Sequence, residues 1–282
     1  MSRPHIEFIQ SQNLEWVEQN TLLEIDGIKS KILSSDSTSG AFTCILNFPK
    51  GWKKKSISFF DADFEFYVLE GSLSISEVEY YSDDYAHLPS GYPQFNSYTK
   101  TGVVLLAFFD KKVETTFANK LESIFDKDRL VKKISCKNAE WNNVDLESMG
   151  LTEISTGSRL LSLFTDPING EITYLTGIMP FQAESSPEHH PVAQEFYVLG
   201  GSLAGNCGIM HSGAYCWRPP FISHGPYGSP SGALVLLRSI GGPLTTTIES
   251  KVKHTYTPDH NPILPEHLKD KGKKQIPKIS RY

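Results

Sequence analysis

The stretch Glu195-Phe196-Tyr197-Val198-Leu199 repeats the stretch Glu65-Phe66-Tyr67-Val68-Leu69, which lies 130 positions earlier in the chain. The same offset aligns Gly71-Ser72-Leu73 with Gly201-Ser202-Leu203. A period of this length is too long for a solenoid repeat and indicates a duplicated domain. The sequence therefore predicts one fold that is built twice.

Short apolar runs make up each repeat, and Gly, Pro, Ser and Asp separate them. Residues such as Phe, Tyr, Val, Ile, Leu and Thr are typical of strands, and many short strands with turns between them favour a sandwich or barrel. The expected strands are 28–34, 41–48, 64–69, 72–75 and 103–109, then 159–164, 172–179, 195–199, 215–218 and 233–239. Between the repeats, the apolar spacing of residues 116–131 predicts a short helix.

The repeats predict two domains and a tail. We expect an amino-terminal barrel over residues 1–135 and a carboxy-terminal barrel over 136–250. Residues 251–282 carry eight Lys or Arg against three Asp or Glu, with four prolines. This composition favours an extended basic arm that lies over a domain or over a neighbouring subunit.

Composition excludes several classes of protein. A net charge of −5 and a pI near 6.0 argue against nucleic acid as the main partner. The amino-terminal residues do not resemble a signal peptide, and no apolar run has the length of a membrane span. The four cysteines form no CxxC pair. Thiols without such a pattern predict a reducing, cytoplasmic location.

Histidines distinguish the two repeats. The second repeat carries His189, His190 and His224, whereas the equivalent positions of the first repeat are Phe59, Phe60 and Gln94. Imidazoles are common ligands of first-row divalent metals. We therefore expect a metal site in the carboxy-terminal barrel alone. In the amino-terminal barrel, Phe side chains would fill the equivalent space and make that barrel structural.

Two segments of the second repeat resemble the conserved motifs of the cupin superfamily. Residues 187–203 contain paired histidines, then an acidic or amide position and a glycine, as in the first cupin motif. Residues 213–226 contain a glycine, a proline turn and His224, as in the second motif. The resemblance is closest to anti-sigma-factor-like (ChrR-like) cupins and their two-domain relatives. It implies an all-β fold of two tandem double-stranded β-helix (jelly-roll) barrels, a bicupin, with a few short helices.

The cupin pattern places the glutamate ligand seven residues before the glycine. Counting back from Gly201, that position is Gln194, and Glu195 is the next residue. Alternate residues of a strand face opposite sides, so both cannot point into the barrel without a bulge. Glu65, the equivalent of Glu195, persists in the repeat that lacks the histidines. This comparison favours Gln194 as the inward residue, as a weak metal ligand or a substrate contact, and a structural role for Glu195.

The first ligand of the motif has two candidates. With His190 as the second histidine of the pair, the first position falls on Glu188, whereas His189 would need a local twist of the chain. The predicted metal ligands are therefore His189, His190, Gln194 and His224, with Glu188 as the alternative to His189. Glu188 and Gln194 are also the candidate catalytic residues.

Two residues of the second motif are candidates for substrate binding. Arg218 can anchor an anionic substrate, and Trp217 lies beside it in the sequence. An arginine next to a tryptophan can also stack on the indole ring, so both readings of this pair remain open.

The resemblance implies a metal-dependent enzyme that acts on a small oxygen-bearing organic molecule, with dioxygenase chemistry as the leading class. A single divalent ion is expected, with Fe²⁺ favoured and Mn²⁺, Zn²⁺ or Ni²⁺ as alternatives. The competing hypotheses are a metal-dependent isomerase, lyase or decarboxylase, and a metal-binding sensor without catalysis. The expected partner is the small-molecule substrate, and edge-strand pairing leaves a homodimer open.

Overall fold

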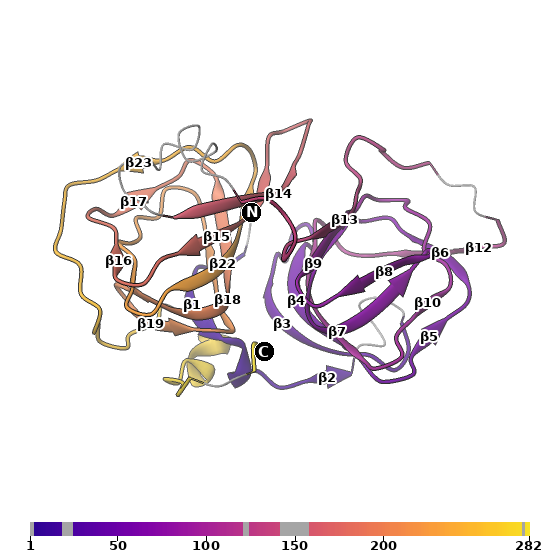
Figure 1. The fold of residues 1–282 in the computed structure, drawn as a ribbon, viewed down its shortest axis with the longest axis horizontal. Coiled ribbons are helices and arrows are strands. Elements are labelled where there is room, and N and C mark those ends of the chain that lie inside the picture. Colours follow the sequence, from indigo (N-terminus) through magenta and orange to yellow (C-terminus); the bar gives the residue numbers. More distant parts are fainter. Residues whose placement is uncertain (1–2, 19–24, 121–123, 142–157, 278–279) are drawn as a thin grey trace. The chain divides into compact units, whose positions relative to one another are not determined.

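The computed structural model describes residues 3–18, 25–120, 124–141, 158–277 and 280–282, and it divides into two compact units. Unit 1 comprises residues 15–139, and unit 2 comprises residues 3–14 and 140–282. Each unit is built almost wholly from β-strands, which confirms the all-β class (Figure 1). None of the helices among these residues is long and apolar enough to cross a membrane.

The main sheet of unit 1 follows the order β13-β9-β7-β11-β4-β3-β2, with antiparallel pairs throughout. Strands β5, β8 and β10 extend it, and β12 pairs with β6. The strands are β2 (Val17–Glu18), β3 (Lys29–Ser35), β4 (Phe42–Phe48), β5 (Lys53–Lys54), β6 (Ile57–Phe60), β7 (Phe64–Ile75), β8 (Val78–Tyr81), β9 (Asp84–Leu88), β10 (Ser97–Tyr98), β11 (Val103–Phe109), β12 (Thr115–Ala118) and β13 (Val131–Ser135).

The main sheet of unit 2 follows the order β1-β20-β18-β22-β15-β14, again antiparallel. Strands β16, β19 and β21 extend it, and β17 pairs with β23. The strands are β1 (Ile6–Gln10), β14 (Arg159–Thr165), β15 (Ile172–Ile178), β16 (Gln182–Ala183), β17 (Glu188–His189), β18 (Ala193–Gly205), β19 (Gly208–His211), β20 (Ala214–Arg218), β21 (Gly228–Ser229), β22 (Ala233–Ile240) and β23 (Thr247–Ile248).

The strand that precedes each repeat belongs to the sheet of the other repeat. Strand β1 precedes the first repeat but pairs with β20 of unit 2, and β13 precedes the second repeat but pairs with β9 of unit 1. The units differ from the domains expected over residues 1–135 and 136–250 in two ways: Arg3–Leu14 belongs to unit 2, and unit 1 ends at Ala139. This exchange brings an amino-terminal segment to the main sheet of unit 2, beside strand β20, which carries Arg218.

Both units use the same glycine at a close approach of two strands. Gly71 and Gly201 have φ of +83° and +73°, a region that disfavours side chains. A Cβ atom at either position would lie 2.1 Å from a carbonyl oxygen, that of Gly102 in unit 1 and that of Gly232 in unit 2. The repeated glycines are therefore explained by folding.

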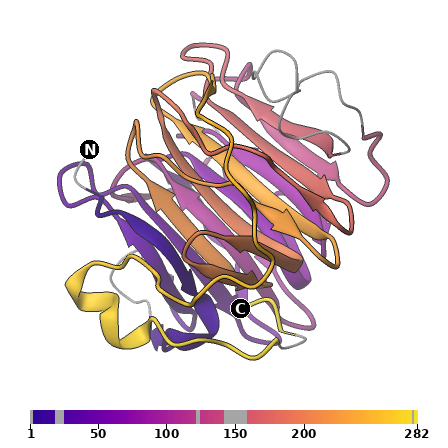
Figure 2. The same ribbon diagram turned by 90° about the vertical axis from the view of Figure 1, so that its left-hand side faces the viewer.

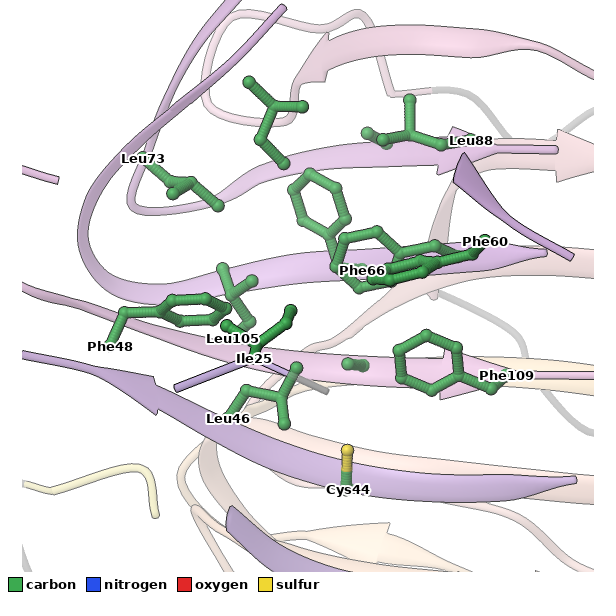
Figure 3. Packing of buried hydrophobic residues seen from close by; sticks show 14 of the residues in the cluster. Ile25, Cys44, Leu46, Phe48, Phe60, Phe66, Leu73, Leu88, Leu105 and Phe109 are labelled. Atoms are coloured by element: carbon green, nitrogen blue, oxygen red, sulfur yellow. The ribbon is translucent and has the colours of Figure 1, made fainter. Parts of the chain in front are cut away.

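Aromatic side chains fill the interior of unit 1. The rings of Phe64 and Phe109 stack with centroids 5.2 Å apart, and Phe60 meets both edge-on. Figure 3 shows Phe60, Phe66 and Phe109 among the aliphatic residues of this core. Phe59, the neighbour of Phe60 on β6, is only partly buried.

Outside the repeats, the structure contradicts the helix that we expect over residues 116–131. Thr115–Ala118 forms strand β12, and the described part of residues 116–131 contains no helix. The structure pairs Thr116 with Phe59, so strand pairing overrides the helical spacing. The arm expected after residue 250 lies, where the structure describes it, against other parts of unit 2, and Ile263 pairs with Glu7 of β1. Within the arm, Glu266–Lys271 forms a 3-10 helix, η2. Figure 2 shows this helix beside the amino-terminal strand.

Candidate metal centre

Two backbone hydrogen bonds bring the halves of the candidate site together. The amide of Glu188 donates to the carbonyl of His224, and the amide of His224 donates to the carbonyl of Glu188, both at 2.9 Å. Glu188 starts the short strand β17, and His224 follows the proline turn after β20. Residues that face each other in such a bridge project their side chains to the same side. His190 lies two positions after Glu188 and shares that side.

The side chains of Glu188, His190 and His224 converge on one point. One ligand atom from each lies within 4.8 Å of the others, and all three residues are buried. Oε1 of Glu188 lies 3.6 Å from Nε2 of His190 and 3.5 Å from Nε2 of His224. These distances exceed those of ordinary hydrogen bonds. Within the part of the chain that the structure describes, this is the one such cluster.

Backbone carbonyls orient both imidazole rings. Nδ1 of His190 lies 3.0 Å from the carbonyl oxygen of Thr245, and Nδ1 of His224 lies 2.8 Å from that of Ile222. A carbonyl only accepts, so each Nδ1 carries the proton and each Nε2 keeps its lone pair for the site. This arrangement is the usual outer-shell support of histidine ligands to a metal.

Two buried atoms of the cluster have no hydrogen-bond partner among the described residues: Oε2 of Glu188 and Nε2 of His224. Leaving buried polar atoms unsatisfied is costly, and a cation between them would satisfy both. Burial alone would raise the pKa of Glu188, but the two imidazoles outweigh it and hold the pKa at about 2. Two imidazoles and a carboxylate are a donor set that fits a divalent first-row metal.

The structure separates His189 from this cluster. Its Nδ1 lies 3.0 Å from Oε1 of Glu249, a partly exposed carboxylate, and the side chain of His189 is itself 29% exposed. Between the two candidates that the sequence left open, the structure places Glu188 in the cluster and His189 outside it. The reason is the strand alternation on β17, where neighbouring side chains face opposite sides.

Gln194 and Glu195 also face opposite sides of their strand. Nε2 of Gln194 lies 3.2 Å from Nε2 of His190, so the amide reaches the cluster. Glu195 faces away, where it accepts a hydrogen bond of 2.7 Å from Tyr215 and pairs with Arg238. Unit 1 repeats this bond, since Tyr85 donates to Glu65 at 2.7 Å. Glu195 therefore has the structural role that its repeat partner indicated.

The orientation of Gln194 is set by Arg218. Nη1 of Arg218 donates to Oε1 of Gln194 at 2.9 Å, which leaves the NH₂ group directed at His190. An amide nitrogen that carries two protons has no lone pair to offer a metal. In this orientation Gln194 is a hydrogen-bond donor to the site, and its oxygen, expected as a weak ligand, is turned away from it.

Arg218 is buried and paired with Glu7 of strand β1. Nε of Arg218 donates to Oε2 of Glu7 at 2.7 Å, and Nη2 donates to Oε1 at 2.5 Å. Nη2 also bonds to the hydroxyl of Tyr227. Burial would raise the pKa of Glu7, but the charge of Arg218 outweighs it and lowers that pKa well below its usual range. The expected anion anchor is thus neutralised inside the protein.

Trp217 lies on the face opposite Arg218, because adjacent residues of β20 alternate. Its register partner on β18 is Glu195, whereas that of Arg218 is Gln194. The guanidinium over the Trp217 ring is that of Arg3, at 4.4 Å from the centroid. Arg218 instead lies over Phe196, at 4.8 Å. Neither Trp217 nor Arg218 lines the pocket described next.

A pocket opens above the cluster of Glu188, His190 and His224. It encloses about 700 Å³, part of it open to solvent, and the cluster and Gln194 form its polar floor. Glu184 adds a second carboxyl group to the lining. Burial, and then the charge of Glu188, raise the pKa of Glu184 well above its usual value. Its Oε2 accepts a hydrogen bond of 2.7 Å from the amide of Tyr227.

Sequence reasoning missed Glu7 and Glu184. No local pattern marks Glu7, whose partner Arg218 lies 211 positions away. Glu184 carried a usable signal, because the equivalent position of the first repeat is Lys54, which lines the smaller pocket of unit 1. A change from Lys to Glu at one repeated position is the kind of difference that also identified the histidines.

Comparisons with known proteins agree with this fold. Residues 140–241 match the model of the ChrR cupin-like domain. No sequence among the curated proteins matches the chain. Among solved structures, a Nostoc punctiforme protein proposed to be a dioxygenase is similar, with 16% identity, a TM-score of 0.77, and coverage of 88% of this chain and 92% of that one.

Two enzymes with solved structures are also similar. Salicylate 1,2-dioxygenase of Pseudaminobacter salicylatoxidans has 10% identity and a TM-score of 0.55, over 74% of this chain and 75% of that chain. Oxalate decarboxylase of Bacillus subtilis has 12% identity and a TM-score of 0.55, over 86% and 78%. At these identities the similarity shows the fold.

Proposed function

We propose that the chain is a metal-dependent enzyme, on the premise of the bicupin fold and of the match between residues 140–241 and the ChrR cupin-like domain. Its substrate is a small oxygen-bearing organic molecule, and dioxygenase-type oxidation is the leading reaction. One observation carries the proposal: two imidazole lone pairs and a carboxylate converge at the floor of a largely apolar pocket. Such a donor set leaves coordination positions for other ligands.

Glu188, His190 and His224 would hold the ion. A bound divalent ion would supply Lewis acidity and, in the case of iron, oxygen chemistry. Iron or manganese is favoured over zinc or nickel, because two imidazoles and one carboxylate with open positions are the donor set of oxygen-activating non-haem iron centres. The carbonyls of Thr245 and Ile222 hold the two rings in the tautomer that presents Nε2.

The remaining residues of the pocket would position the substrate. Gln194 presents N–H donors beside His190, and Arg218 prevents the amide from turning over. The apolar walls would exclude water from the reacting atoms. These residues act by orientation and by hydrogen bonding, without a change of charge.

Glu184 favours a second candidate class, namely an isomerase, lyase or decarboxylase. Burial and the charge of Glu188 raise the pKa of this pocket carboxyl well above its usual value, and such a shift favours the protonated form that a general acid needs. Glu188, which we had expected in that role, has a pKa of about 2 and stays ionised. Gln194 cannot titrate. The similarity to oxalate decarboxylase is consistent with this class.

Metal analysis tests the proposal. We expect about one ion per chain in the wild type and a loss of at least about tenfold in His190→Ala and His224→Ala, because each removes an imidazole ligand. His189→Ala is the matched control and should retain the metal, since His189 pairs with Glu249 outside the cluster. Equal metal content in all four proteins would reject the site.

Turnover assays then separate the classes. The iron-loaded protein should consume oxygen with a panel of enols, diketones and catechols, whereas an isomerase or lyase would convert substrate without oxygen. In the second class, Glu184→Gln should abolish turnover and leave the metal content unchanged. A protein that retains metal but converts no candidate under either condition would favour a metal-binding sensor.

A further inference from the structure

The walls of the unit 2 pocket are apolar over most of their area. Leu160, Ile178 and Val235 contribute aliphatic surface, and Phe196, Leu237 and Leu244 complete it around the polar floor. Transferring a charged group from water to such surroundings is strongly unfavourable unless an opposite charge receives it. The nature of the ligand therefore depends on which charges the pocket offers.

The described lining contains no lysine or arginine. Arg218 lies behind the floor and does not line the pocket: Nε and Nη2 donate to Glu7, Nη2 also to Tyr227, and Nη1 to Gln194. The Glu7 carboxylate offsets the Arg218 charge within the protein interior. A negatively charged group in the pocket would find no cationic side chain to receive it.

The ionisable groups of the lining are acidic or are the metal-binding imidazoles. The two carboxyl groups are those of Glu184 and Glu188, and neither can carry a positive charge. Beside His190, the floor presents the neutral NH₂ group of Gln194, which can donate a hydrogen bond to an uncharged oxygen.

We propose that this pocket selects a ligand whose body is uncharged and apolar, and that Gln194 donates a hydrogen bond to an oxygen atom of that ligand. The inference rests on the proposed function, because the oxygen atoms that would contact the metal orient the ligand. Substrates that carry a carboxylate on another part of the molecule than the metal-contacting oxygens would be excluded. Neutral enols, diketones and catechols fit, in contrast to the anionic substrate that Arg218 suggested.

A matched pair of probes tests this selection. Protocatechuate and its carboxamide share the catechol oxygens and nearly the same shape, and they differ in one negative charge. Calorimetric titration of the zinc-loaded protein avoids redox turnover, and the metal-free protein is titrated in parallel. We expect the carboxamide to bind at least about tenfold more tightly than the carboxylate in the zinc-loaded protein, with the same preference in the metal-free one.

Equal binding of the two probes, or tighter binding of protocatechuate, would overturn the proposal. So would failure of the carboxamide to bind a protein that retains zinc. If the chain retains no zinc, the proposed function fails. In that case, the ratio of the two affinities in the metal-free protein still tests whether the pocket selects the uncharged probe, because the pocket walls and not the ion produce this ratio.

Two variants locate the origin of the preference. Glu7→Gln keeps the shape of the side chain but removes the charge that offsets Arg218. The ratio of carboxamide affinity to protocatechuate affinity should therefore fall by about threefold or more. Glu266→Gln removes an exposed carboxylate of η2 and should leave the preference unchanged. An unchanged preference in folded Glu7→Gln would overturn the role of the Glu7–Arg218 pair. The wild-type comparison does not depend on either variant.

Discussion

Each of the two units contains the same antiparallel bridge between two short segments, and the side chains beside that bridge differ between the units. In unit 2 the bridge joins Glu188 to His224, and in unit 1 the equivalent bridge joins Ser58 to Gln94 with nearly the same hydrogen-bond lengths. Phe60 takes the place of His190. Duplication thus preserved the scaffold, and a few inward side chains decide whether its centre is an aromatic core or a candidate metal site.

The largest expected effect comes from converting unit 2 into unit 1. The double variant His190→Phe/His224→Gln introduces the residues of the first repeat and removes both imidazole ligands. We expect metal content to fall at least about tenfold, measured by elemental analysis of the purified protein. His189→Phe introduces the equivalent of Phe59 and should leave the metal in place. Loss of metal in His189→Phe would contradict the conclusion that His189 lies outside the metal site.

The next effect concerns Arg218, whose equivalent in unit 1 is Leu88. Arg218→Leu would leave Glu7 buried without its cation, and we expect a loss of about 3–5 kcal/mol in the free energy of unfolding. Glu7→Leu/Arg218→Leu should recover much of that loss, because no uncompensated charge remains. Denaturant unfolding of the three proteins measures the effect, and a double variant no better than the single one would contradict it.

Phe60→Ala tests the aromatic core of unit 1. The side chain is buried against Phe64 and Phe109, and its removal leaves a cavity. We expect a loss of about 3–4 kcal/mol in the free energy of unfolding, with no change in metal content. A fall in metal content with unit 2 still folded would show that the first unit takes part in metal binding.

The smallest effect tests what the units share. Tyr85→Phe and Tyr215→Phe each remove a hydroxyl that donates to a buried carboxylate, that of Glu65 or that of Glu195. We expect each variant to lose about 1–2 kcal/mol in the free energy of unfolding, and neither to lose metal. An effect on metal content in Tyr215→Phe would give Glu195 a role beyond folding.

Much of the fold could be predicted from the sequence because its signals are local. Strand β11 covers the predicted residues 103–109, since a continuous apolar run bounded by turns is read without knowledge of its partners. The prediction of a helix over residues 116–131 was wrong because the conformation there depends on a distant partner. Apolar spacing there is weak, and pairing of β12 with β6 decided the conformation.

In the candidate site, too, local signals predicted some residues and left others open. The repeat and the alternation of strand β18 were enough to separate Gln194 from Glu195. Local alternation could not choose between Glu188 and His189, because the choice depends on which of them faces His224 across the bridge. Register between segments that lie 36 positions apart is set by tertiary packing.

By itself, the sequence determined the duplication, the strands, and the restriction of the histidines to one copy, since these are properties of residue order and period. The tertiary structure alone decided that Glu7 reaches Arg218 from the strand that precedes the other repeat. It also decided that Glu184 joins the pocket and that Arg218 is neutralised. The physical reason is that strand pairing joins distant segments, and no local pattern encodes which segment arrives beside a buried charge.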